Sequence, residues 1–324
     1  MKKDLIYRGF KATTILIGLA FMIYGCEQNS AQSDHVRTSF EKNVKDSVVY
    51  LPPVKEVRPV ICYQVDSLHS PRIVDSLKLK LAKQEQATIA AINRIDLWRL
   101  KIGKKVVIPD TLTPNLLDYS PFPYEMKIFD SIPKTVLISQ RIQGFALYER
   151  SQLVRWGPVS TGKMSTPTPN GLHYGNYKAK RKISTVDSDW IMPYYFNFMN
   201  FYGVGVHEYG MPGFPASHAC VRLFQEDARF IYDWAEQWQL DRKGQVVERN
   251  GTPFMVFGEF DYEGKLPWLK LAENSEHNNL SGAEMDTLRS YVNNYFKDKR
   301  NFPKPQDLQG VHIAVPVDGI DTFR

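Results

Sequence analysis

The segment from His207 to Arg222, HEYGMPGFPASHACVR, constrains the fold of this chain more than any other stretch. It places two histidines and a cysteine around a loop rich in proline and glycine, which continues neither a helix nor a central strand. Cys220 is therefore expected on a turn, with an accessible side chain and neighbouring amides that can point at one place. A free thiol has a pKa of about 8.5, so a reactive cysteine needs a nearby imidazole or another positive group. His207 and His218 are the candidates for that role.

Two other interpretations of these residues are open. His207, His218 and Cys220 could be three ligands of a zinc ion, although a His-x-Cys pair is unusual spacing for a structural site. No further cluster of Cys or His lies close by in the sequence, so we expect no metal and no cofactor. Each residue taken alone could also be structural, because a lone cysteine is most often a small buried hydrophobe. The joint spacing favours a catalytic thiol over both alternatives.

The same segment resembles the signature of the L,D-transpeptidase (YkuD-like) catalytic domain family: an upstream His, then Ser-His-Gly-Cys, then Arg or Asn. The matching positions here are His207, Gly213, Pro215, Ser217, His218, Cys220 and Arg222. Ala219 stands where the family normally has glycine. An alanine suits an ordinary backbone conformation but not a positive φ, so this departure bears on the geometry of the amides in the turn.

The resemblance implies a reaction. Cys220 would attack the L-to-D peptide bond of a peptidoglycan tetrapeptide stem and release the terminal D-Ala. The acyl group would then pass to an amine acceptor. His207 would be the general base and later the general acid, since the pKa of an ordinary imidazole is already close to the working pH.

The remaining site residues are assigned supporting roles by the same resemblance. His218 and Ser217 would hold the turn, orient His207 or donate to the substrate, and the backbone amides of Ala219 and Cys220 would form the oxyanion hole. Arg222 would bind a substrate carboxylate with its planar fork, the alternative being a structural ion pair. In the aromatic segment DWIMPYYFNF, Trp190, Tyr194 and Tyr195 are candidates to line the groove that binds the donor stem peptide. We predict that Tyr194 binds the substrate.

Two further functions compete with transpeptidation. The first is an L,D-carboxypeptidase, in which water takes the acyl group. The second is a catalytically inactive, wall-binding lipoprotein, which Ala219 alone favours. In each case the expected partners are peptidoglycan stem peptides or the wall itself. The net charge of +6 does not indicate nucleic acid, because no run of Lys and Arg interleaved with aromatics forms a recognisable binding module.

The N-terminus has the features of an export signal. Four basic residues precede an apolar run from Ala12 to Gly25, which is too short for a comfortable membrane span. The sequence IYGC resembles a lipobox with Cys26 as the lipidated residue, the alternatives being an uncleaved anchor or an ordinary signal peptide. We therefore expect a periplasmic lipoprotein of the cell envelope, anchored to the membrane through Cys26. Cys62 is expected to be a buried or idle thiol.

The chain divides by composition into successive segments. Residues 1–25 are read as the signal peptide and 26–50 as a flexible, polar tether. Residues 51–112 are expected to form a small LysM-like unit, with a strand near 54–65 and a helix over 74–95. Its second half, from Ile89 to Asp110, resembles a LysM-type module through Asn93, Ile95, Gly103 and the closing VVIPD strand, the alternative being a helix-strand packing unit without affinity for carbohydrate. A proline-rich linker follows at 113–133. The catalytic domain is expected at 134–260 and a C-terminal extension at 261–324, with a helix at about 281–297 capped by Ser281.

The hydrophobic period changes after Lys134. Alternating apolar and polar residues with turn residues at 149–152 predict a β-hairpin, and the only clear helix of this region is expected over 227–238. The resemblance implies a β-sandwich with one helix after the nucleophile turn. With the small α/β N-terminal unit and the C-terminal helix, the predicted fold class is α+β.

Overall fold

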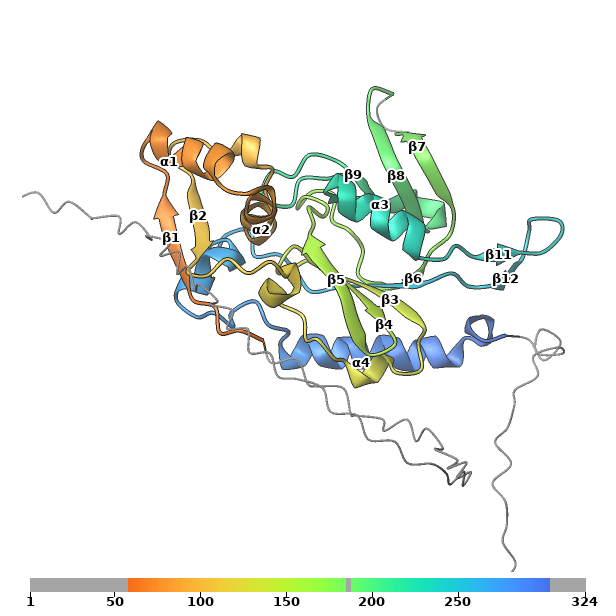
Figure 1. Cartoon of the computed structure of the whole chain (residues 1–324). Helices are drawn as coiled ribbons and strands as arrows, with labels where there is room; N and C mark the ends of the chain where they lie inside the picture. Colours follow the sequence, from red (N-terminus) through yellow and green to blue (C-terminus); the bar gives the residue numbers. More distant parts are fainter. Residues whose placement is uncertain (1–57, 185–187, 304–324) are drawn as a thin grey trace, which may run out of the picture. The chain divides into compact units, whose positions relative to one another are not determined.

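Two β-sheets pack face to face and enclose a hydrophobic core (Figure 1). The computed structural model describes residues 58–184 and 188–303, so the predicted signal peptide and Cys26 lie outside the described residues. The order in the larger sheet is β5 (Gln152–Pro158), β4 (Gly144–Glu149), β3 (Lys134–Ser139), β13 (Pro253–Phe257) and β6 (Gly171–Tyr174). Strand β13 is parallel to β3, and the other neighbours in this sheet are antiparallel.

The smaller sheet carries the segment that contains the cysteine and the histidines. Its order is β10 (Val221–Leu223), β9 (Val204–Glu208), β8 (Ile191–Met199) and β7 (Lys178–Ile183), with β10 parallel to β9. Helix α3 (Gln225–Trp234) follows β10 and packs on β8 and β9. Its buried side chains include Ala228 and Ile231, as the helical spacing predicts. The helix ends earlier than expected, because Ala235 has an extended backbone with ψ of 156°.

The larger sheet is buried on both faces. Its inner face contributes Ile138 and Phe145 to the core between the sheets, while Leu137 and Tyr148 point into a second core on the outer side. Consecutive residues of β3 and β4 are therefore buried, rather than alternately buried and exposed. The predicted hairpin is present at β4–β5, and β3 adds a third antiparallel strand to it.

The N-terminal unit covers part of that outer face. Its elements are β1 (Tyr63–Ser67), α1 (Pro71–Asp75), a π-helical turn (Ser76–Lys80), α2 (Lys83–Asn93) and β2 (Lys105–Pro109), and β1 is antiparallel to β2. The prediction of one helix over 74–95 was wrong, because the chain is extended at Leu81 and Ala82. The apolar positions serve two cores, which a single straight helix could not reach: Leu77 packs within the N-terminal unit and Ile92 packs against the sheet.

The segment 113–133 does not act as a separating linker. Phe122, Phe129 and Ile132 are fully buried in the outer core together with residues of the sheet. The Trp156 indole also donates a hydrogen bond to the Leu116 carbonyl, 2.6 Å away. Proline-rich composition suggested an open connection, but its aromatic residues are buried because the outer face of the sheet needs an apolar cover.

The C-terminal extension completes this cover. Helix α4 (Gly282–Lys297) runs along the side of the larger sheet that faces away from α3 (Figure 1). A capping box starts the helix: the Glu284 amide donates to the Ser281 hydroxyl at 3.2 Å, and the Ser281 amide donates to the Glu284 carboxylate at 2.9 Å. The same carboxylate accepts two bonds from Arg141, at 2.9 and 2.8 Å, and so joins α4 to the turn between β3 and β4.

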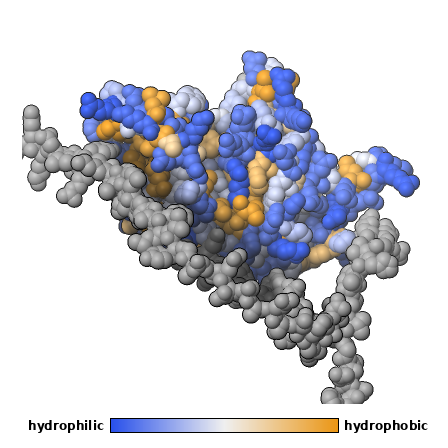
Figure 2. All heavy atoms as spheres, viewed as in Figure 1, coloured by the Kyte–Doolittle hydropathy of each residue, from blue (hydrophilic) through white to orange (hydrophobic). Residues whose placement is uncertain are grey.

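The remaining elements are short. They are the 3-10 turns Leu97–Arg99, Leu116–Tyr119, Lys127–Phe129, Asn200–Tyr202, Pro267–Ala272 and Lys299–Asn301, with strands β11 (Gln239–Leu240) and β12 (Val247–Arg249). Within residues 58–184 and 188–303, no helix has the length and apolar character needed to cross a membrane. The face seen in Figure 2 is mostly hydrophilic, with separate hydrophobic patches.

Loss of the Glu284 carboxylate is expected to destabilise the fold. The Glu284 side chain is only 8% exposed, and Glu284→Ala removes the charged partner of Arg141, which keeps only its bonds to the His277 and Asn279 carbonyls. We expect the free energy of unfolding to fall by about 3 kcal/mol, measured by urea denaturation. Glu273→Ala is the matched control, since its ion pair with Lys265 is 66–69% exposed and is expected to contribute less than about 1 kcal/mol. Equal losses in the two variants would contradict this assignment.

Candidate active site

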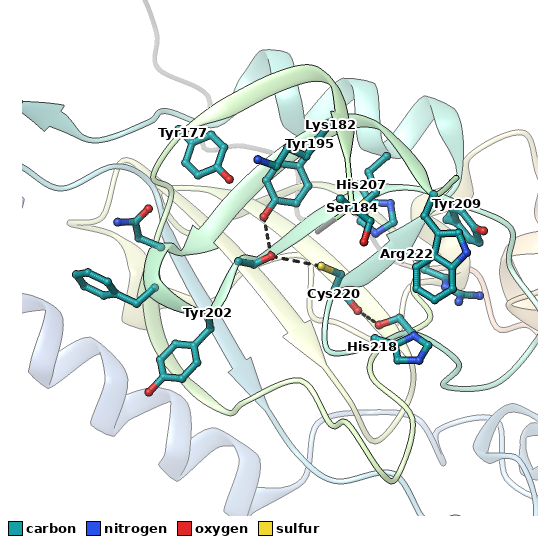
Figure 3. Close-up of a pocket in the computed structure, with 16 residues that line it drawn as sticks. Tyr177, Lys182, Ser184, Tyr195, Tyr202, His207, Tyr209, His218, Cys220 and Arg222 are labelled. Carbon is teal, nitrogen blue, oxygen red and sulfur yellow. Dashed lines mark hydrogen bonds between the residues drawn. The ribbon is translucent and has the colours of Figure 1, made fainter. Parts of the chain in front are cut away.

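Cys220 lies on an irregular turn immediately before β10 and lines a cavity of about 400 Å³. Its sulfur is 3.7 Å from the carbonyl oxygen of Gly203, which also accepts a 2.7 Å bond from the Tyr195 hydroxyl (Figure 3). Gly203 has a φ of 65°, a conformation that glycine adopts without strain. The thiol is therefore positioned from the other side of the cavity by the turn between β8 and β9.

His207 lines the same cavity because β9 and β10 are parallel neighbours. In their register Arg222 is paired with His207 and Val221 with Val206, so Cys220 stands at the end of β10 next to the histidine strand. The two side chains face one cavity in Figure 3. Residues thirteen positions apart in the sequence are thus brought together by one strand pairing.

One hydrogen bond fixes the orientation of the His207 ring. Its Nδ1 is 2.8 Å from the carbonyl oxygen of Glu208, and a carbonyl only accepts, so Nδ1 carries the proton and donates it. The Nε2 atom of the neutral ring is then left with a lone pair that can take a proton. The Glu208 carbonyl therefore sets the tautomer of the His207 ring, a role that a carboxylate has in many catalytic groups.

Burial keeps both reacting groups neutral. It lowers the pKa of His207 to about 4, with a smaller lowering from Arg222, while the bond to Glu208 opposes it. Burial also raises the pKa of the Cys220 thiol, against the Gly205 backbone and Arg222, which lower it. At neutral pH the resting pair is therefore thiol and imidazole.

The nucleophile turn is held by the loop between β5 and β6. The Thr161 carbonyl accepts from the amides of Ala216 and Ser217, at 3.1 and 3.0 Å. The Thr168 hydroxyl donates to the Ala219 carbonyl at 2.8 Å. Ser217 is buried, and its hydroxyl donates to the carbonyl of Cys220 within the turn.

Ala219 adopts the conformation that its side chain disfavours. Its φ is 76°, in the left-handed region where a β-carbon costs about 1 to 2 kcal/mol. The expectation that alanine would be incompatible with a positive φ was therefore wrong, and the surrounding bonds impose the turn despite the methyl group. Within the described residues, the amides of Ala219 and Cys220 donate to no other backbone group, so both are free to face a developing oxyanion.

Arg222 and His218 both line the cavity but make different contacts. The Arg222 guanidinium donates to the Ala216 carbonyl at 2.8 Å and stacks over the Tyr209 ring at 4.7 Å, so it also holds the turn. His218 is exposed and stacks against Trp190, with ring centroids 5.0 Å apart. Its Nε2 is 3.1 Å from the Lys163 ammonium, and burial together with Lys163 and Arg222 lowers its pKa. His218 therefore lies at the exposed rim of the cavity, whereas His207 is buried.

The prediction that Tyr194 contacts substrate was wrong. Its ring packs edge-on against Tyr232 of α3, 6.0 Å away, on the core side of β8. Met192 and Tyr195 both line the cavity although they are three residues apart, because the positive φ of 50° at Tyr194 interrupts the alternation of the strand. Sequence periodicity gave no sign of this interruption.

Several lining residues were not predicted from the sequence. They are Tyr177, Lys182, Ser184, Met192, Asn200, Phe201, Tyr202, Gly203 and Tyr209. Most come from β7, β8 and the turn after β8, and only the pairing of these strands places them near Cys220. None of the described lining residues is Asp or Glu, whereas Lys182 and Arg222 are cationic, so the cavity suits an anionic substrate.

The described residues contain no group of three His, Cys, Asp or Glu side chains that could hold a metal ion. Cys62 is exposed and free, so of the two expected states, buried or idle, the buried one is wrong. It lies one residue before β1, beside the buried Ile61, and its amide donates to Asp110.

Comparison with protein-family models matches residues 133–256 to the L,D-transpeptidase catalytic domain, YkuD. The match covers the segment that carries His207 and Cys220, and it supports an L,D-transpeptidase-type catalytic fold for this part of the chain. Solved structures similar to the chain include an L,D-transpeptidase from Stackebrandtia nassauensis, with 26% identity, 40% of this chain and 57% of that chain covered, and a TM-score of 0.32. No curated protein matches the chain.

Two further L,D-transpeptidase structures are similar over the same part. L,D-transpeptidase 1 of Mycobacterium tuberculosis is 23% identical, over 39% of this chain and 62% of that chain, with a TM-score of 0.30. The enzyme of Enterococcus faecium is 20% identical, over 39% of this chain and 50% of that chain, also with a TM-score of 0.30. The chain thus spans less than two thirds of the length of these proteins.

Ala219→Gly is expected to stabilise the L,D-transpeptidase-type domain. Glycine removes the strain at a φ of 76° but adds entropy to the unfolded chain, which leaves a net gain of about 0.5 to 1 kcal/mol in urea denaturation. Ala216→Gly in the same turn is the control, because Ala216 has an ordinary negative φ and should lose about 0.5 to 1 kcal/mol. A loss of stability in both variants would show that position 219 is not strained.

His207 is expected to titrate at about pH 4 in the folded protein. An ordinary histidine is half protonated at about pH 6.5, so between these values the buried ring stays neutral while exposed rings gain a proton. NMR spectra of ¹³C-labelled histidine measure the midpoint, and a His207→Asn variant assigns the signal. A midpoint near 6.5 would show that the ring is hydrated and would remove the basis for a neutral resting pair.

Proposed function

We propose that the protein is a peptidoglycan L,D-transpeptidase in which Cys220 is the nucleophile and His207 the general base. The observation that carries the proposal is the joint geometry of the two side chains. Parallel strands bring them to one cavity, and the Glu208 carbonyl fixes the His207 tautomer with Nε2 available. The family match of residues 133–256 supports the same class of reaction.

The acylation step follows from these positions. Nε2 of His207 takes the Sγ proton as sulfur attacks the carbonyl carbon of the L-to-D peptide bond. The carbonyl oxygen gains the negative charge and faces the free amides of Ala219 and Cys220. When the tetrahedral intermediate collapses, the C–N bond breaks and the imidazolium gives its proton to the leaving D-Ala amine. A thioester on Cys220 remains.

The second half of the reaction uses the same base. An acceptor amine attacks the thioester carbonyl, Nε2 removes a proton from that amine, and the C–S bond breaks with return of the proton to sulfur. Burial keeps His207 neutral, so its Nε2 lone pair is available in both halves, although a pKa of about 4 lies below the value near the working pH that an ordinary imidazole would have. If water took the place of the amine, the product would be a trimmed tripeptide and the activity an L,D-carboxypeptidase.

The site of action is part of this proposal. We place the enzyme in the periplasm, held to a membrane of the cell envelope by a lipid on Cys26, on the basis of the basic and apolar N-terminus. Metabolic labelling with a fatty acid analogue tests this placement. Label should enter the full chain and be absent from Cys26→Ala, and equal labelling of both would disprove the anchor.

A product assay tests the reaction itself. The full chain in detergent is incubated with disaccharide tetrapeptide, and mass spectrometry detects a crosslinked dimer, a trimmed tripeptide or unchanged substrate. We expect the dimer, and we expect Cys220→Ala to lower its formation by at least about 10³-fold. Cys62→Ala is the matched control and should keep full activity, because that thiol lies outside the cavity.

Acylation by a carbapenem gives an independent readout, since the ring-opened drug would add its mass to the peptide that contains Cys220. Absence of both products together with absence of this adduct would rule out the enzymatic function. Full activity in Cys220→Ala would instead show that the nucleophile is wrongly assigned.

A further inference from the structure

The loop from Tyr209 to Pro215 connects the end of β9, which carries His207, to the turn that carries Cys220. Few hydrogen bonds within the loop can hold it in one conformation. It contains two glycines and two prolines, and proline has no amide proton to give to a strand ladder. Such a loop holds one conformation only if groups outside it satisfy its backbone. Met211, at its centre, is nevertheless fully buried.

The N-terminal unit supplies these external bonds through Asp96. The Met211 amide donates to the Asp96 carboxylate at 2.8 Å, and the Asp96 amide donates to the Met211 carbonyl at 2.9 Å. One residue thus satisfies both backbone groups of Met211. Arg99 donates to the same carboxylate oxygen at 3.0 Å and keeps it in place.

Ile95, the residue before Asp96, packs on the same loop. It forms an isolated antiparallel bridge with Pro212. At Gly213, which has a φ of 87°, a β-carbon would meet the Ile95 side chain at 3.6 Å. The loop is therefore docked on the N-terminal unit over three consecutive residues.

Arg94 reaches the nucleophile turn by a second route. It is fully buried, and its Nε donates to the Ile142 carbonyl at 3.1 Å. The next residue, Gln143, accepts from the Thr161 amide at 2.9 Å and donates to the Thr161 hydroxyl at 2.8 Å. Thr161 is the residue whose carbonyl holds the amides of Ala216 and Ser217.

We infer that Asp96 is a positioning residue for the Cys220–His207 pair. The N-terminal unit that carries Asp96 is therefore part of the structure that holds the catalytic centre in place. The segment 94–96 holds both the loop that leaves His207 and the turn that carries Cys220. A shift of Met211 moves the loop between the two reacting groups, and a displacement of about 1 Å at such a site can cost about a hundredfold in rate. The inference rests on the proposed function only for its turnover readout.

Two substitutions separate position from charge. Asp96→Asn keeps an acceptor oxygen at the same distance from the Met211 amide but loses the charge that pairs with Arg99. Asp96→Glu keeps the charge but moves the oxygen by one methylene. If Asp96 acts through position, the Asn variant retains turnover within about fivefold, because a partly exposed ion pair contributes little. The Glu variant should then lose about tenfold to a hundredfold in kcat, with a smaller change in KM.

A second readout does not require transpeptidase activity. The rate of Cys220 alkylation by iodoacetamide is measured against pH in the full chain, with peptide mass spectrometry to separate Cys220 from Cys62. In the Glu variant we expect the loosened loop to admit water, so that the midpoint moves toward that of an ordinary cysteine. The Asn variant should keep the parent profile. Asp75→Asn, an exposed carboxylate of the same unit, is the control and should match the parent.

The outcomes decide the inference in each case. A Glu variant that matches the parent in turnover and alkylation would overturn it, as would an Asn variant more impaired than the Glu variant. If no variant or parent turns over substrate, the proposed function fails, while the alkylation profiles still test the positioning role. Circular dichroism and thermal melting of each variant confirm that the comparison is made between folded proteins.

Discussion

The parallel pairing of β9 with β10 is the constraint on which the site depends. A turn of a few residues cannot connect parallel neighbours, so the chain between them must cross from one end of the strands to the other. The crossing is the glycine- and proline-rich loop that follows His207, and it returns at Cys220. The catalytic grouping is therefore a consequence of one strand register, and the loop that makes it possible is also the part that needs support from elsewhere.

Burial then determines the chemistry of the pair. Both His207 and Cys220 face a cavity walled by strands and aromatic rings, where the charged form of either group is disfavoured. A preformed thiolate–imidazolium pair is thus not the resting state. The cations Arg222 and Lys182 line the same cavity, and in the proposed reaction they would favour the negative charge that develops on sulfur and oxygen during attack. The arrangement stabilises charge when substrate is present and suppresses it at rest.

The parts that sequence reasoning predicted are those with a local chemical signature. The spacing of His207 and Cys220, the capping box at Ser281 and the β-rich class all follow from residues close together in the chain. The prediction for Tyr194 was wrong because its own left-handed backbone interrupts the alternation of side chains along β8. Aromatic residues also suit either face of a strand, so the sequence could not show which side Tyr194 faces. Lining residues such as Tyr177 and Lys182 were missed because strand pairing alone brings them near the thiol. At Ala219 the local rule did not hold. Alanine disfavours a positive φ, but the hydrogen bonds around the turn impose one.

The outer face of the larger sheet explains why the segments around the catalytic domain could not be separated by composition. Leu137, Tyr148 and Phe257 form an apolar surface that must be covered, and residues from the N-terminal unit, from 113–133 and from α4 all cover it. A chain cut to residues 133–256 would expose this surface to water, at a cost that grows with the area uncovered. The region that matches the catalytic family is thus one layer of a larger fold. Because the covering layers also carry Arg94, Asp96 and Glu284, the elements that stabilise the sheet are the ones that brace its loops and the nucleophile turn.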